Sequence, residues 1–80
     1  LYFQMGISHA ELGRYPSALE AIDKAIALGG EKGLYLYGRG RVLLQSGRKA
    51  EGEADIRRAA ELGDPDAVEY VKGLNPKPAG

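Results

Sequence analysis

Two side chains suited to binding, Tyr37 and Arg41, lie four residues apart in the middle of this 80-residue chain. On a helix, that spacing places both side chains on one face, where an arginine can stack over a tyrosine ring. Tyrosine and arginine are also enriched among the residues that carry the binding energy of protein interfaces. The pair therefore indicates either a partner-binding face or a simple intramolecular stack, and both interpretations stay open.

The sequence contains no set of residues with the spacing that catalysis or metal binding requires. His9 is the only histidine, cysteine is absent, and no acidic cluster lies beside His9 at a metal-ligand spacing. The serines lack the base partner and the third, orienting group that a catalytic triad needs. The segment 38–41 alternates glycine and arginine but lacks the fingerprint of a phosphate-binding loop. We therefore predict no enzyme activity, no cofactor and no metal.

The charge pattern argues against nucleic acid and membrane partners. The 11 basic residues are balanced by 11 acidic ones, whereas a nucleic-acid surface needs a clustered basic excess. The basic pair Arg57–Arg58 has Glu53, Asp55 and Glu61 around it, which is typical of a solvated helix face. No apolar run approaches the roughly 20 residues of a membrane span. The sequence indicates no cellular location.

Apolar residues recur at helical spacing along the chain and predict about five helices. The third predicted helix contains Gly38 and Gly40, each of which costs about 1 kcal/mol relative to alanine in an exposed helix. Two short strands, 34–37 and 42–44, are the alternative. We prefer the helix because glycine allows a second helix to approach closely. The predicted ranges are 5–12, 16–28, 33–45, 49–62 and 65–73.

The residues around Pro65 form a helix-start signal. Asp64 is placed to cap the helix, Pro65 to occupy its first position, and Asp66 to face the positive end of the helix dipole. This role accounts for the two acids better than a pair of catalytic carboxylates does. A helix is therefore predicted to begin at Pro65.

The segment 47–62 is a second copy of 13–28. Every matched residue is displaced by the same offset (47 − 13 = 34), and a fixed offset is the signature of a repeat array. We call this 34-residue correspondence the repeat register. The matched pairs are Gly13/Gly47, Arg14/Arg48, Ile22/Ile56, Ala25/Ala59, Leu28/Leu62 and Gly29/Gly63.

In this register the chain resembles tetratricopeptide repeats, which are helix–turn–helix units of 34 residues. Small residues match the family on the first helix (Gly6 and Gly40) and on the second helix where the two cross (Ala18 and Gly52). The segment 58–67 is also similar to the related Sel-like repeats. The resemblance covers nearly all of residues 5–74 and implies an all-α fold of antiparallel helix–turn–helix repeats, a fragment of an α-solenoid.

The resemblance also implies a function. In tetratricopeptide arrays the first helices line a concave groove, so the first helix of the complete unit would face a partner. The implied partner-binding residues are Leu34, Tyr37, Arg41, Leu44 and Gln45. The family's clamp for the C-terminal carboxylate of chaperones needs lysine and asparagine at matching positions, and only Arg41 suits that role.

A protein–protein interaction module that binds a peptide or helix is therefore the first hypothesis. The alternative is a self-association or scaffold module of a larger repeat protein. Repeat arrays usually need at least three units for stability, so uncapped ends would pair between copies into a homo-oligomer.

The sequence divides into five predicted segments. Residues 1–4 look like the remnant of an expression tag that ends in a protease site. In the repeat register Tyr2 aligns with Leu36 and Phe3 with Tyr37, so we expect the remnant to complete the first helix and cover apolar surface. The remaining segments are an incomplete unit (5–30), a complete unit (31–63), a capping helix (64–74) and a flexible tail (75–80).

Overall fold

The computed structural model describes residues 1–74 and contains five α-helices in this range. The predicted all-α fold is confirmed, and the alternative of strands at 34–37 and 42–44 is wrong. The predicted tail, 75–80, lies outside the described residues. The helices are α1 (Tyr2–Glu11), α2 (Tyr15–Gly29), α3 (Gly33–Gln45), α4 (Lys49–Glu61) and α5 (Pro65–Leu74).

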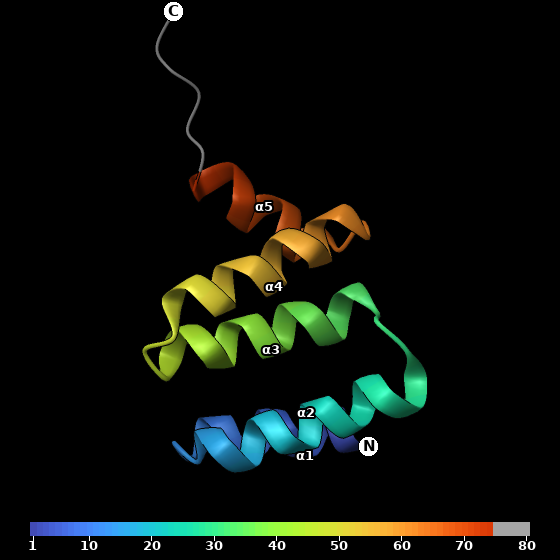
Figure 1. Cartoon of the computed structure of the whole chain (residues 1–80), viewed down its shortest axis with the longest axis vertical. Helices are drawn as coiled ribbons and strands as arrows, with labels where there is room; N and C mark the ends of the chain where they lie inside the picture. The colour runs from blue at the N-terminus through green and yellow to red at the C-terminus, as the bar shows by residue number, and fades with distance from the viewer. Residues whose placement is uncertain (75–80) are drawn as a thin grey trace, which may run out of the picture.

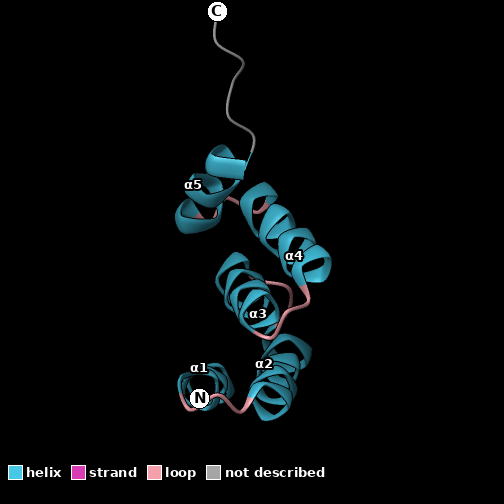
Figure 2. Cartoon of the chain, turned by 90° about the vertical axis from the view of Figure 1, so that its left-hand side faces the viewer, coloured by secondary structure: helices cyan, strands magenta, loops and turns pink. Residues whose placement is uncertain are grey.

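The helices stack in chain order (Figure 1). Helices α1, α3 and α5 run from right to left in that view, and α2 and α4 run the other way, so each neighbouring pair is antiparallel. Figure 2 shows α1 and α5 on the left, α2 and α4 on the right, and α3 between them. Helices α1 and α5 therefore lie on one side of the stack, α2 and α4 lie on the other, and α3 lies between the two sides.

Glycine allows the tight turns that join the helices of each unit. Gly47 has a φ of +91°, its N–H donates to the carbonyl of Leu44 at 3.1 Å, and the N–H of Arg48 donates to Leu43 at 2.8 Å. This pair of bonds satisfies carbonyls at the end of a helix and requires a left-handed residue, which glycine provides without a steric penalty. Gly13 takes the same conformation after α1.

The two helices of each unit cross at very short distance. A Cβ atom at Gly40 would lie 2.5 Å from Cγ1 of Ile56 and 2.7 Å from the carbonyl oxygen of Gly52, so only glycine fits here. In the first unit, a Cβ atom at Gly6 would lie 3.0 Å from the carbonyl oxygen of Ala18. These four small residues lie where the repeat register predicts the crossing.

The core consists of two buried clusters that α3 connects. Side chains of α3, α4 and α5 form the first cluster, and side chains of α2 and α3 form the second. Two faces of α3 are therefore used for packing, against α4 and against α2. The members are Leu36, Ile56, Ala59 and Ala67 in the first cluster, and Ala18, Ile22 and Val42 in the second.

Residues 1–4 contribute to α1, as expected from the repeat register. The helix begins at Tyr2, and the ring of Phe3 lies 5.1 Å from that of Tyr35, between centroids. Phe3 also packs beside Gly38, whose missing side chain leaves room for the ring. Gly38 therefore allows another helix, α1, to approach α3 closely.

Most predicted helix ends are correct to within one residue. Asp64 caps α5 as predicted, accepting a hydrogen bond from the N–H of Ala67 at 2.9 Å. Helix α4 ends at Glu61 rather than Leu62, which takes the capping position. Helix α2 begins at Tyr15, so Pro16 is its second residue, and the missing N–H of a proline is harmless anywhere in the first turn.

Candidate partner-binding groove

A groove of about 280 Å³ lies between α1 and α3, with the first turn of α5 at its edge. Its floor is apolar and comes from both helices: α1 contributes Phe3 and Ile7, and α3 contributes Gly38 and Val42. Gly38 lowers the floor on the α3 side because it has no side chain. We call this feature the α1/α3 groove.

The helical period of α3 explains why this face is open. Leu36, Gly40 and Leu43 are buried, and they repeat at intervals of three and four residues along one side of the helix. Tyr37 directly follows the first of these buried residues and Arg41 directly follows the second. Each is therefore rotated by about 100° around the helix axis from its buried neighbour. That rotation places both side chains in the wall of the groove, where Tyr37 stays partly buried against the first core cluster and Arg41 is exposed.

The structure places four of the five predicted binding residues in the α1/α3 groove: Leu34, Tyr37, Arg41 and Gln45. Leu44 lies elsewhere, because it packs against the first core cluster. The Cγ atom of Leu44 lies close to α4, because a Cβ atom at Gly52 would come within 2.9 Å of it. The ten residues from Leu34 to Leu44 rotate by about 1,000°, which is roughly 80° short of three full turns. Leu34 and Leu44, both among the predicted binding residues, therefore lie on different faces of α3.

Both interpretations of the Tyr37–Arg41 pair have structural support. The guanidinium carbon of Arg41 lies 5.8 Å from the centroid of the Tyr37 ring, which is a cation–π contact. The stacked pair nevertheless lines the groove, so it presents a tyrosine ring and a charged group to any partner that enters.

Sequence reasoning missed the residues that other helices bring to the groove. Phe3, Ile7 and Glu11 line it from α1, and Asp66 lines it from α5. The repeat register contained a signal for the first three, which lie 34 residues before Tyr37, Arg41 and Gln45. No such signal points to Asp66, because its contribution depends on how α5 packs against the neighbouring helices.

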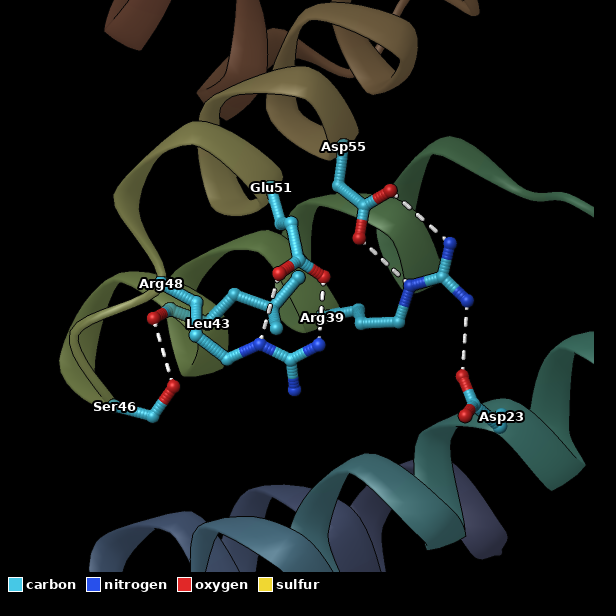
Figure 3. Close-up of polar contacts among 7 residues, drawn as sticks. All are labelled: Asp23, Arg39, Leu43, Ser46, Arg48, Glu51 and Asp55. Carbon is cyan, nitrogen blue, oxygen red and sulfur yellow. Dashed lines mark hydrogen bonds and ion pairs between the residues drawn. The ribbon is translucent and has the colours of Figure 1, made fainter.

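A charged network joins the two units at a separate hollow, formed by α2, α3 and α4 (Figure 3). Arg39 donates two hydrogen bonds to Asp55 on α4, at 2.7 and 3.0 Å, and one to Asp23 on α2, at 2.9 Å. The bond to Asp55 is the main cause that raises the pKa of Arg39 above its ordinary value. Every cation here has an acidic partner, since Arg48 pairs with Glu51 at 2.7 Å. The hollow therefore supports the architecture of the stack.

Metal-ligating side chains do not gather at any one place in the described part of the chain. Residues 1–74 contain no group of three or more His, Cys, Asp or Glu side chains placed to hold a metal ion. The Nδ1 atom of His9 is buried without a hydrogen-bond partner among these residues. Within the same range, every helix is too short or too polar to cross a membrane.

Comparison with known proteins agrees with the architecture. The family model for the tetratricopeptide repeat matches residues 3–67, which is more than half of the chain. No curated protein and no solved structure gives a match. The similarity to Sel-like repeats stays a prediction. The matched range includes both helical hairpins and the start of α5, so the chain belongs to the tetratricopeptide repeat family.

Proposed function

We propose that the α1/α3 groove binds a peptide or a helix of a protein partner. Tetratricopeptide repeats generally mediate protein–protein interaction or scaffolding, and the family is typically non-enzymatic. The observation that carries the proposal is the composition of the groove, which combines an apolar floor with the stacked pair of Tyr37 and Arg41. Apolar pockets with a few polar groups are typical binding sites.

A comparison of the two units supports this location. Packing positions keep similar residues across the register, as with Gly6 and Gly40 at the helix crossings. Groove positions change between the units: α1 has Ile7 where α3 has Arg41. A packing requirement shared by both units does not explain a charged residue at one of these positions. A partner that contacts the two helices differently does explain it.

Self-association is the second candidate. It is favoured by the exposure of two large apolar side chains, since Leu12 is 68% exposed and Leu28 is 76% exposed. Light scattering separates the candidates, because a groove-binding module remains monomeric as its concentration rises. A concentration-dependent dimer would favour self-association.

The direct test uses peptides selected from a random display library for binding to the purified chain. Replacing Tyr37 and Arg41 together by alanine should abolish binding of these peptides and leave the helicity close to wild type, with a lower melting temperature because Tyr37 packs against the first core cluster. Arg57→Ala is the matched control, because Arg57 is exposed on α4 and lies outside the groove. Peptides that bind the double variant as well as the wild type would contradict the proposal.

A further inference from the structure

Arg41 forms no ion pair with a carboxylate among the described residues, and the same is true of the exposed Arg57 on α4, whereas three neighbouring arginines are paired. Arg39, Arg48 and Arg58 each have an acidic oxygen within 3.1 Å. Within residues 1–74, no carboxylate lies within 4.0 Å of the Arg41 guanidinium, and no hydrogen bond to it is formed. Its N–H donors therefore have no acceptor in the described part of the fold.

The surroundings of Arg41 prepare it for a negatively charged group. The ring of Tyr37 stacks on the guanidinium, with 5.8 Å between the ring centroid and the central carbon. Contact with the ring occupies none of the guanidinium N–H donors in a hydrogen bond, so these donors stay available for a planar acceptor. Arginine and carboxylate form two parallel hydrogen bonds in this geometry. Arg41 is exposed, so a carboxylate of a partner can reach it.

The other charges in the groove limit where an acidic group fits. Helices α1, α3 and α5 run in the same direction, so the first turn of α5 lies near the start of α3. Asp66 therefore marks one end of the groove, and Glu11, the last residue of α1, marks the other. Arg41 lies between them along the axis of α3. The order of charge along the groove is negative, positive, negative.

We infer that the partner is a protein segment that contains an aspartate or glutamate and, next to this acid, a bulky apolar residue. The acidic side chain pairs with Arg41. The apolar side chain packs on the floor formed by Ile7, Gly38 and Val42. Acidic residues are absent from the parts of the segment that face Glu11 and Asp66. This inference rests on the proposed function and adds the chemistry of the partner.

A polyanionic partner does not fit this charge order. A nucleic acid strand carries a negative charge at every phosphate, so it would place charges opposite both ends of the groove as well as opposite Arg41. The carboxylates of Glu11 and Asp66 would repel it at those ends. A peptide can place a single acid at the required position, and this favours a protein segment.

The test is a random peptide library displayed on phage and selected on the wild-type chain and on Arg41→Glu. Peptides from the wild-type chain should be enriched in aspartate or glutamate next to a bulky apolar residue. Peptides from Arg41→Glu should instead contain lysine or arginine at that position. A hydrogen bond to a charged group contributes about 1.5–3 kcal/mol, so Arg41→Gln should weaken a wild-type peptide by about tenfold or more.

The matched control is Arg57→Glu, which changes the net charge by the same amount on an exposed position of α4 outside the groove. It should leave the affinity of the peptide unchanged. Exchanging the acid of the peptide for lysine should abolish binding to the wild-type chain and restore binding to Arg41→Glu. Recovery of this kind requires direct pairing between the two side chains.

Two further outcomes separate this inference from the proposed function. Peptides that require Tyr37 but show no enrichment in acids, and bind Arg41→Glu and Arg57→Glu equally, would overturn the inference and leave the groove as the binding site. Selected peptides that bind the Tyr37→Ala, Arg41→Ala variant as well as the wild type would overturn both.

Discussion

Replacing Gly40 by alanine should destabilise the chain, although alanine is the better helix former. Gly40 lies inside α3, where a Cβ atom would come 2.5 Å from Cγ1 of Ile56 and 2.7 Å from the carbonyl oxygen of Gly52. The oxygen belongs to the backbone of α4, and Ile56 is fully buried, so neither neighbour can move without shifting the helix. The substitution must therefore push α3 and α4 apart.

The expected magnitude follows from two opposing effects. Overpacking a tightly packed core typically costs about 1–3 kcal/mol, and contacts this short with backbone place Gly40 in the upper half of that range. Alanine regains about 1 kcal/mol through its higher helix propensity. The net loss in the free energy of unfolding should be about 1–2 kcal/mol. For a chain of this size, that corresponds to a fall in melting temperature of roughly 4–16 °C.

Two other glycines provide matched controls for the same substitution. A Cβ atom at Gly73, in α5, has no neighbour within 4 Å, so Gly73→Ala should raise stability by about 0.5–1 kcal/mol. At Gly38 the Cβ atom would meet the end of the Phe3 ring, which can turn away, so Gly38→Ala should be close to neutral. Urea or thermal unfolding followed by circular dichroism measures all three. If Gly40→Ala stabilises the chain as much as Gly73→Ala does, the close crossing of α3 and α4 is refuted.

Three further substitutions test other contacts by thermal or urea unfolding. Arg39→Gln should cost about 1–3 kcal/mol because it leaves the carboxylate of Asp55 without its partner, and an unchanged stability would mean that the network is dispensable. Asp64→Ala should cost about 0.5–2 kcal/mol through the loss of the cap of α5; the idea fails if the helicity and midpoint of unfolding stay at wild-type values. Phe3→Ala should cost about 1–2 kcal/mol, below the 3–5 kcal/mol of a fully buried phenylalanine, and a neutral result would show that residues 1–4 do not complete α1.

Local patterns and the repeat register predicted most of the fold. The helical period and the turn glycines determine where the helices begin and end, because both depend on neighbouring residues in the chain. The register added a relation between distant segments: it paired Gly6 with Gly40, and both lie at crossings between helices. Repeats make this possible because each unit must solve the same packing problem.

Sequence reasoning brought groove-lining residues together only within a single helix. Tyr37 and Arg41 are one turn apart on α3, so their spacing alone places them together. Leu44 lies on a different face from Leu34 because a small angular difference accumulates over ten residues. The contributions of Ile7 and Asp66 depend on the packing of α1 and α5 beside α3, which the pattern of one helix does not contain.

The network around Arg39 shows a second reason for the limits of sequence reasoning. The repeat register places Met5 and Gly73 at the positions equivalent to Arg39, so the network occurs once and leaves no repeated signal. Its three members come from α2, α3 and α4, each separated by 16 residues along the chain. Charged side chains at such separations have many possible partners, and only the arrangement of the helices selects among them.

Nuclear magnetic resonance tests the central claim, that the α1/α3 groove binds the partner, most directly. The chain is labelled with ¹⁵N, and a selected peptide is added while the amide signals are followed. The account predicts that the amides of Ile7, Gly38 and Arg41 shift together and saturably. Shifts confined to the exposed faces of α2 and α4, with the amides of these three residues unchanged, would contradict it.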